Sequence, residues 1–408
     1  MFDNSNVIVG LEIGTTKVCA IVSEFNPDTA GLNIVGVGQA KSRGVRKGEI
    51  VDAATAEEDV RNALHAAEEM SNSEIHSVYL GVSGAHIRGF TNRGIHPIVS
   101  ADRAITEDDQ QDVVKNAKAV NLPPGGHVVH AVRQHFIVDG QRGIANPEGM
   151  HGSRLEVDVH VVHGNFNRLQ TAVRLVKNLN LEVEDVVFNG LAAPLALLTN
   201  EHKELGALVL DLGGGTTNYA VYAGGILKYT GVLALGGDHV TNDLAIGLKT
   251  SLGRAEQLKL EHGGAFVDEA VKGKTIPIPS DVGLPPQEVN WERLRRIQHL
   301  RLEEIFQLVG RDLDEQGMLE KLRAGIFLCG GGARTPGIVR LAVDTFQMPA
   351  SLGQTTTIGS IESSVNQPEF AATIGLVKFG SLRQKRRRAT SFTANLRNTF
   401  GSLFKIGA

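Results

Sequence analysis

A strand, a glycine-containing turn and a second strand occur twice in this chain, about 200 residues apart, and this repetition constrains the fold more than any other feature. The first copy is "GLEIGTTKVCAIV", which turns at Gly14, and the second is "LVLDLGGGTTNYAVY", which turns at Gly213. An acid precedes each turn by two residues, Glu12 in the first copy and Asp211 in the second. This self-similarity predicts two related halves, and a chain of 408 residues is longer than one compact core usually needs.

The second turn carries three consecutive glycines. A glycine inside an element costs roughly 0.5–1 kcal/mol relative to alanine, so three of them at the end of an apolar strand indicate that something approaches the backbone closely. A tight hairpin turn without a ligand would explain the same residues. A third glycine turn, "CGGGART", also follows an apolar strand, and the helix after it is expected to have Thr335 as its N-cap and Pro336 as its first residue.

The composition excludes several other classes of protein. The chain is 42% hydrophobic and 21% charged, which is typical of a soluble globular protein, and its net charge of −4 argues against binding to bulk nucleic acid. The first residues lack a basic segment, and no apolar run is long enough to cross a bilayer, so neither a signal peptide nor a membrane-spanning helix is expected. Cys19 and Cys329 lie in apolar strand-like runs, which indicates reduced thiols and a cytoplasmic protein.

Strands and helices alternate along the chain, which predicts an α/β fold. "TAEEDVRNALHAAEEMSNS" predicts an amphipathic helix with Thr55 as its N-cap, and helical spacing of apolar residues predicts a long helix over residues 291–314. Residues 85–162 are rich in Gly, Pro and His and contain strand-like runs together with one helix, roughly 107–120, capped by Thr106. We interpret this stretch as a small inserted subdomain.

The common nucleotide-binding fingerprints are absent, because neither G-x-x-x-x-G-K-[ST] nor a G-x-G-x-x-G after a strand occurs. Two facing hairpin turns can nevertheless hold phosphates with backbone N–H groups and threonine hydroxyls. Carboxylates at the strand ends, Glu12 and Asp211, can hold Mg²⁺ through water, and Lys17 can neutralise phosphate charge. The third turn suits a ribose and a base.

Six segments in this order resemble the actin-type ATPase superfamily: "GLEIGTTKV", "NGLAAPLALL", "LDLGGGTTNYAV", "LGGDHVTNDLA", "LCGGGARTPG" and "ATIGLVKFG". In that superfamily they are the first phosphate motif, the first connecting helix, the second phosphate motif, a further glycine turn, the adenosine motif and the second connecting helix. "GVGQAKSRGVRKGEIVD", "SVYLGVSGAHI", "AEQLKLEHG" and the insert resemble, more narrowly, the FtsA family of bacterial cell-division proteins. The resemblance covers nearly the whole chain.

The resemblance implies an actin-like two-domain fold of the duplicated ribonuclease H type, with an FtsA-type insert and a C-terminal amphipathic helix. The implied parts are subdomain 1A (residues 1–84 with 163–204), subdomain 1C (85–162), subdomain 2A (205–238 with 317–380), subdomain 2B (239–316), a basic linker (381–389) and a membrane-targeting helix (390–408).

The same resemblance implies ATP and Mg²⁺ as cofactors. The implied metal residues are Asp211 and Glu12; the implied nucleotide residues are Gly14, Thr15, Thr16 and Lys17 on one side, Gly213, Gly214, Gly215, Thr216, Thr217 and Asn218 on the other, and Gly237, Glu256, Lys259, Gly330, Gly331, Gly332 and Arg334 around the adenosine. A solvated charge pair would also explain Glu256 and Lys259.

Hydrolytic relatives carry an acid near the first connecting helix or at the end of the second phosphate motif, where this chain has Gly190 and Asn218. Neither residue can take a proton from water, and a general base contributes about 10²–10⁴-fold to a rate. We therefore expect ATP to be bound far better than it is hydrolysed.

The last 39 residues contain eight Lys and Arg and no acid. The apolar residues Phe392, Leu396, Phe400, Leu403 and Phe404 fall on one helical face, with Arg397 and Lys405 among them in sequence. An interfacial membrane helix explains both features. A disordered basic tail, a helix docked on the body, and a nucleic-acid tail are the alternatives.

The resemblance implies a peripheral protein at the division septum, on the cytoplasmic face of the inner membrane. Its implied partners are the C-terminal peptide of the tubulin-like FtsZ, other divisome proteins, further copies of itself and anionic lipid, but no nucleic acid. The arginines that could meet an acidic peptide are Arg293, Arg295, Arg296 and Arg301. A kinase or chaperone-type ATPase on the same fold is the competing class, and a filament protein of pilus assembly is a third.

Overall fold

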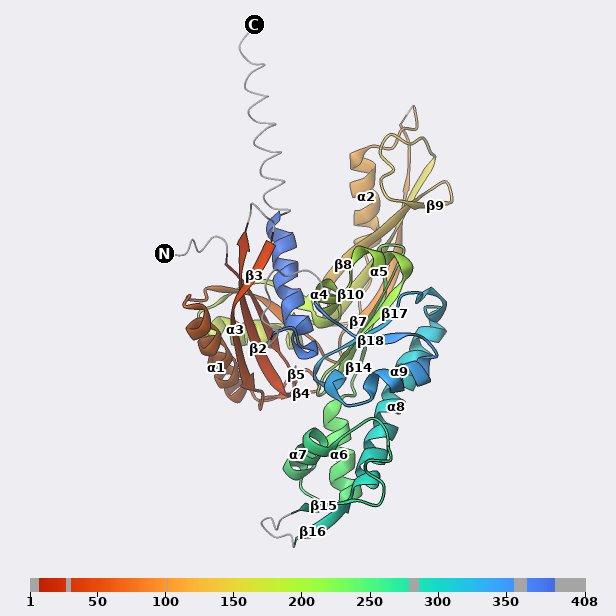
Figure 1. Ribbon diagram of the computed structural model, residues 1–408. Coiled ribbons are helices and arrows are strands. Elements are labelled where there is room, and N and C mark those ends of the chain that lie inside the picture. Colours follow the sequence, from red (N-terminus) through yellow and green to blue (C-terminus); the bar gives the residue numbers. More distant parts are fainter. Residues whose placement is uncertain (1–6, 27–30, 101, 279–285, 356–364, 386–408) are drawn as a thin grey trace.

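The computed structural model describes residues 7–26, 31–100, 102–278, 286–355 and 365–385. Its core consists of two five-stranded sheets, one from each half of the chain, and a four-stranded sheet extends from the first half (Figure 1). The two large sheets have matching strand orders, β11-β6-β1-β2-β3 and β18-β17-β12-β13-β14. In both, the first three strands of the half are antiparallel neighbours and the later strands join in parallel. The predicted duplication is therefore confirmed.

The first half contains one large sheet with helices packed on it. Its elements are β1 (Val7–Ile13), β2 (Lys17–Asn26), β3 (Gly31–Lys41), the short hairpin β4 (Val45–Arg46) and β5 (Glu49–Ile50), α1 (Ala53–Ser71), β6 (Ser77–Val82), α3 (Phe166–Asn178), β11 (Glu182–Phe188), α4 (Asn189–Leu197) and α5 (Asn200–Leu205).

The insert, defined here as β7 through β10 with α2, forms the upper right lobe in Figure 1. Its elements are β7 (Arg88–Pro97), α2 (Glu107–Lys118), β8 (Gly126–Val138), β9 (Gln141–Ile144) and β10 (Arg154–Asn165). The predicted Thr106 cap is confirmed, since its side chain accepts from the N–H of Asp109 and that carboxylate accepts from the Thr106 N–H in return.

The second half contains the other large sheet and a lower lobe, defined as α6, α7, α8, β15 and β16 (Figure 1). Its elements are β12 (Ala207–Leu212), β13 (Thr217–Ala223), β14 (Ile226–Leu233), α6 (Gly237–Leu248), α7 (Leu252–His262), β15 (Thr275–Ile278), β16 (Gln287–Asn290), α8 (Trp291–Glu315), β17 (Gly325–Cys329), α9 (Ile338–Phe346) and β18 (Ala350–Leu352). The long helix predicted over residues 291–314 is confirmed as α8.

Two predicted helix starts are wrong. The N-cap of α1 is Asp52, not Thr55, because the Asp52 carboxylate accepts from the Thr55 N–H and the helix begins three residues earlier than expected. Helix α9 begins after Gly337 and not at Pro336, because Gly337 has a φ of +82° and the Pro336 carbonyl accepts a hydrogen bond from Ala265 in the lower lobe.

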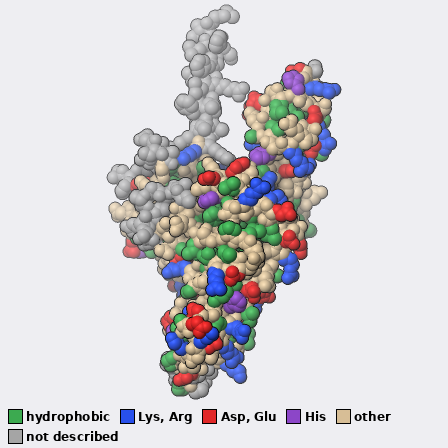
Figure 2. Space-filling model, turned by 45° about the vertical axis from the view of Figure 1, so that its right-hand side comes forward, with side chains coloured by type: hydrophobic (Ala, Val, Ile, Leu, Met, Phe, Trp, Pro, Cys, Tyr) green, Lys and Arg blue, Asp and Glu red, His purple; other side chains and the backbone are tan. Residues whose placement is uncertain are grey.

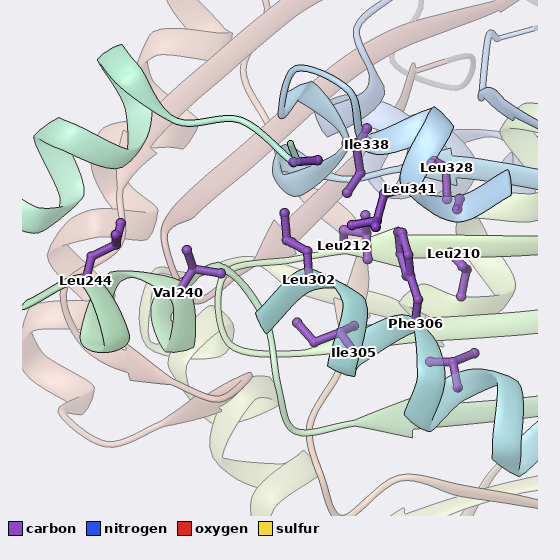
Figure 3. Close-up of a cluster of buried hydrophobic side chains, with 14 of the residues drawn as sticks. Leu210, Leu212, Val240, Leu244, Leu302, Ile305, Phe306, Leu328, Ile338 and Leu341 are labelled. Carbon is purple, nitrogen blue, oxygen red and sulfur yellow. The ribbon is translucent and has the colours of Figure 1, made fainter. Parts of the chain in front are cut away.

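The largest core of the second half lies between its sheet and the helices α6, α8 and α9. Figure 3 shows Leu210 and Leu212 of β12 facing Leu302, Ile305 and Phe306 of α8, with Leu328, Ile338 and Leu341 beside them and Val240 and Leu244 of α6 nearer the lower lobe. This packing fixes α6 and α8 against the strands that carry the second glycine turn.

The two halves share a separate buried core around α4 and a helix over residues 371–385, which contains side chains from both large sheets. The helices cross where a Cβ added to Gly375 would lie 1.9 Å from the carbonyl oxygen of Ala192. These are the segments that resemble the two connecting helices, so the halves are joined at a backbone contact that only glycine permits. The described part of the expected basic linker, residues 381–385, continues this helix.

The insert also contacts the second half. The His160 Nε2 lies 2.9 Å from the Thr230 hydroxyl of β14, and Gln134 donates to the Leu227 carbonyl at 2.8 Å. Burial lowers the pKa of His160 to about 4. The neutral ring has one donor and one acceptor nitrogen, and the hydroxyls of Thr91 and Thr230 satisfy both.

We predict that Gly375→Ala lowers the free energy of unfolding by about 3 kcal/mol, the upper end of the usual cost of overpacking, because a clash with a backbone carbonyl cannot relax by a rotamer change. Urea unfolding measures the difference. Gly253→Ala is the matched control: this glycine lies in α7 with no atom within 4 Å of the added Cβ, so stability should stay equal or rise by about 0.4–1 kcal/mol. Equal effects of the two substitutions would contradict the crossing.

Candidate functional site

The two hairpin turns that repeat in the sequence face each other across the halves. In each turn the first glycine donates to a carbonyl three residues on: Gly14 to Lys17 at 3.0 Å and Gly213 to Thr216 at 2.9 Å. A Cβ on Gly214 would lie 2.4 Å from Thr16 Cγ2. Close approach between the two turns therefore requires glycine here. A tight hairpin turn with no close neighbour would not explain it.

The second turn also rests on the first turn of α6. Gly237 and Asp238 donate to the carbonyls of Gly213 and Gly214 at 3.0 and 2.8 Å. The Thr217 hydroxyl donates to the Leu235 carbonyl at 2.9 Å. These hydrogen bonds fix the peptide groups of the second turn from the side of α6.

Glu12 and Asp211 occupy equivalent positions, the first near the end of β1 and the second near the end of β12. Asp211 is buried and accepts from Asn218 Nδ2 at 3.1 Å, while Glu12 accepts from the Thr373 hydroxyl at 2.8 Å and from Asn189 Nδ2 at 3.3 Å. Burial, and after it the charge of Glu12, raises the pKa of Asp211 to about 7. Two carboxylates held this close favour a cation between or beside them.

Ser83, which the sequence analysis did not single out, connects the halves at this site. Its hydroxyl donates to Asn218 Oδ1 at 2.6 Å and lies 3.1 Å from the Thr216 hydroxyl. Both ends of the Asn218 amide are therefore engaged, since its oxygen accepts from Ser83 and its nitrogen donates to Asp211. Gly190 has no room for an acid, because an added Cβ would lie 2.5 Å from the Phe188 ring.

The Lys17 ammonium already has protein partners, although its charge still opposes the rise in the pKa of Asp211. The ammonium donates to the Glu369 carbonyl and lies 4.8 Å from the centroid of the Phe370 ring. Arg334 is likewise engaged nearby, in an ion pair of 2.6 Å with the Glu369 side chain. Both expected ligands thus contact the segment that leads into the helix over residues 371–385.

Glu256 and Lys259 of α7 contact the start of α6, whose first turn supports the second glycine turn. Lys259 pairs with Glu256 at 2.7 Å and donates to the Thr241 hydroxyl at 2.9 Å and the Gly237 carbonyl at 3.2 Å. Only 13% of the Lys259 side chain is exposed, so a purely solvated pair does not describe it.

The third turn lies against the second. A Cβ on Gly330 would lie 2.5 Å from Asp211 Oδ1, and one on Gly332 would lie 2.8 Å from the Leu212 Cβ, whereas Gly331 has no atom within 4 Å. The positive φ of Gly330, +81°, adds a second reason for glycine there. Gly331 therefore presents open backbone at the edge of the site.

The expected membrane residues Phe392, Leu396, Arg397, Phe400, Leu403, Phe404 and Lys405 lie outside the described residues. Within the described part of the chain, every helix is too short or too polar to span a bilayer. In the same part, no three His, Cys, Asp or Glu side chains are grouped as direct ligands of a metal ion.

Known structures share this architecture. A PilM–PilN type IV pilus biogenesis complex aligns with a TM-score of 0.64 at 17% identity, over 92% of this chain and 98% of that one. MreB5 of Spiroplasma citri bound to ADP aligns with a TM-score of 0.57 at 16% identity, over 95% of this chain and 99% of that one. The duplicated sheets, crossing helices and facing turns define an actin-like fold.

Comparisons with known sequences identify the family within this fold class. The family model "Cell division protein FtsA" matches residues 208–375, and "SHS2 domain inserted in FTSA" matches residues 84–163. A cell division protein FtsA of Pseudomonas aeruginosa is 36% identical over 93% of this chain and 91% of its own length, and one of Borreliella burgdorferi is 38% identical over 93% and 92%. The chain belongs to the FtsA family of cell division proteins.

The buried Asp211 carboxylate makes stability depend on pH. Because its pKa is raised from 3.8 to about 7, the folded chain binds more protons than the unfolded chain between these values, and stability falls as pH rises through that window. We predict that Asp211→Asn removes this slope. Relative to the parent, the variant should gain about 2–3 kcal/mol of unfolding free energy between pH 5 and pH 8, measured in urea. A constant difference between the two proteins across that range would contradict the assignment.

Proposed function

We propose that this chain is an actin-like cell-division protein that binds ATP with Mg²⁺, polymerises on the cytoplasmic face of the inner membrane at the division septum, and tethers FtsZ filaments there. Recruitment of later divisome proteins would follow from that position. Membership in the FtsA family supports the division role. The observation that carries nucleotide binding is the pair of facing glycine turns beside the buried Asp211 carboxylate and the half-buried Glu12 carboxylate.

The residues present fit a magnesium nucleotide. Backbone N–H groups of the two turns, with the hydroxyls of Thr15, Thr16 and Thr216, suit phosphate oxygens. Asp211 and Glu12 suit a hydrated Mg²⁺, which keeps several of its waters in most protein sites. Glu256 and Lys259 would contact the ribose and base, with Gly331 leaving room for the adenosine. When bound, the metal would neutralise phosphate charge.

We also propose that ATP is hydrolysed slowly, because neither Asn218 nor Gly190 supplies a general base. Asn218 is committed to Ser83 and Asp211, and Gly190 cannot be replaced by an acid without displacing Phe188. The competing proposal, an enzyme of the kinase or chaperone type, needs a general base that these positions do not supply. Robust steady-state ATP turnover by the isolated chain would favour the enzyme.

We predict that Asp211→Ala lowers the affinity for Mg-ATP by about 10-fold or more and leaves the affinity for ATP in excess EDTA nearly unchanged, since the carboxylate acts through the cation. Calorimetry with and without Mg²⁺ measures both. Glu201→Ala, which removes an exposed acid on α5, is the matched control and should bind as the parent does. Unchanged Mg-ATP affinity in Asp211→Ala would remove this residue from the site.

The lower lobe offers the surface best suited to an acidic FtsZ peptide. Arg295 pairs with Asp268 and Arg301 with Asp243, but Arg293 and Arg296 of α8 are exposed and have no carboxylate partner among the described residues. The large apolar side chains Ile246 and Leu300 are also exposed on α6 and α8. On the face in Figure 2, cations and anions are interspersed over this lobe, which favours a local peptide contact over a broad nucleic-acid surface.

The insert contains none of the three glycine turns. Hydrogen bonds join the insert to β14 through His160 and Gln134. They support a role in assembly or partner contact that depends on the position of the second half. We propose that the insert takes part in filament formation or in contact with further division proteins.

The C-terminal sequence supports membrane attachment. Burial of five apolar side chains and attraction of its cations to anionic lipid favour binding, while ordering of a free tail opposes it. Gly401 within the predicted helix weakens it by about 1 kcal/mol. One tail should therefore hold one molecule weakly, and neighbouring subunits of a filament would add their tails through effective concentration.

We predict that co-sedimentation with anionic liposomes rises steeply with protein concentration in Mg-ATP and carries added FtsZ into the pellet. A variant ending at residue 389 should do neither. Phe400→Glu and Asn398→Glu introduce the same charge on the apolar and polar faces of the predicted helix, so only the first should abolish pelleting. A hyperbolic binding curve, or full pelleting of the truncated chain, would contradict coupled polymerisation and attachment.

A further inference from the structure

The hairpin of β4 and β5 places its tip between the two glycine turns. Its strands pair Val45 with Ile50 and Arg46 with Glu49, so Lys47 and Gly48 form a two-residue loop. Both loop residues have positive φ, +51° and +75°, which is the backbone of a type I′ hairpin turn. The hairpin is short, and the tip is therefore defined by its turn.

The tip contacts both turns at once. Gly48 donates its N–H to the Thr15 hydroxyl of the first turn at 2.9 Å. A Cβ on Gly215, the last glycine of the second turn, would lie 2.6 Å from the Lys47 Cα. Since the Thr15 oxygen accepts from Gly48, its own hydrogen stays free to donate to another acceptor in the gap between the turns.

The base of the hairpin is held firmly. Val51 and Asp52 both donate to the Gly44 carbonyl, at 2.9 and 3.1 Å, and Glu49 forms an ion pair with Arg168 of α3. A Cβ on Gly48 would also lie 3.1 Å from the Gly84 backbone. The tip thus has a fixed position relative to the first half.

Lys47 is an exposed cation at this point, and no carboxylate pairs with it among the described residues. Its charge reaches across to the second half, where, after burial, it contributes to lowering the pKa of His239 in the first turn of α6. Lys17, by contrast, is occupied by the Glu369 carbonyl and the Phe370 ring. Of these two lysines, Lys47 is the one available beside both turns.

The position of the tip along the second turn says which part of a nucleotide it would meet. The elements suited to adenosine contact the opposite end: Lys259 reaches Gly237, which donates to Gly213, and Gly330 lies against Asp211. The hairpin contacts Gly215, farther along the turn. A nucleotide that enters from the adenosine side therefore has its terminal phosphate nearest to the hairpin.

We propose that the β4–β5 hairpin is a third wall of the phosphate site and that Lys47 binds the terminal phosphate of the nucleotide. This rests on the proposed function, in which phosphates lie between the turns. The chemistry is that of an ammonium donor and an anionic oxygen, together with the Thr15 hydroxyl that the hairpin orients. The hairpin then connects the phosphate end of the ligand to both halves.

The test compares Lys47→Gln with Arg46→Gln, which removes the same charge from the adjacent exposed residue of the same hairpin. Calorimetry with Mg-ATP should show a loss of about 10-fold or more for Lys47→Gln and less than about 2-fold for Arg46→Gln. Adenosine affinity should be unchanged in both. Gly215→Ala, whose added Cβ would displace both the Lys47 backbone and the Thr15 hydroxyl, should lower the affinity at least as much, with urea unfolding used to show that each variant is folded.

Each of the other possible outcomes would contradict one part of the proposal. If the parent chain binds Mg-ATP and Lys47→Gln binds it equally well, or if Arg46→Gln loses as much affinity, the role of Lys47 is wrong while nucleotide binding stands. If Lys47→Gln loses adenosine affinity to the same extent, the residue acts on the fold of the site and not on the phosphate. If the parent chain binds no nucleotide, the proposed function fails together with this inference.

Discussion

Close backbone contact between the two halves is the constraint on which the rest of this structure depends. It occurs where the glycine turns face each other, where α4 crosses the helix over residues 371–385, and where the insert meets β14. At each place a glycine stands where a Cβ would collide: Gly214 against Thr16, Gly375 against Ala192, and Gly89 against Thr230. Halves that meet at backbone distance cannot move independently, so any opening of the site must be accommodated at these contacts.

The second constraint is charge. Asp211 is buried beside Glu12 and costs stability when it ionises, which is why its pKa rises to about 7. A chain selected for stability alone would carry a neutral side chain there, so the retained carboxylate points to a function that needs it. A divalent cation near the pair would reverse the balance, lower that pKa and release a proton. If the proposed cation binds there, it would stabilise the folded chain by mass action.

Local patterns predicted much of the fold, because strand–turn–strand units, helical spacing and the Thr106 cap all depend on residues that are close together in the sequence. The N-cap of α1 was misassigned between two nearby candidates, Asp52 and Thr55, and the other errors arose where distant contacts decided the outcome. The start of α9 is set by a bond from Ala265 to Pro336, and the Lys17 ammonium is drawn to a carbonyl 352 residues further along the chain. Ser83 meets Asn218 across 135 residues and leaves no pattern in the sequence. The residues of the turns were predictable; the orientation of their neighbours required the assembled halves.

The strands of the second half provide a rigid path from the turns to the insert. β13 begins at Thr217, directly after the second turn, and pairs along its whole length with β14. β14 in turn is bonded to the insert through Thr230 and His160, whose neutral ring is kept by burial. The hairpin of β4 and β5 contacts the same turn from the first half. A shift of the second turn relative to the hairpin would therefore move β13 and β14 as one unit and strain their bonds to the insert, which would couple the proposed phosphate site to the insert.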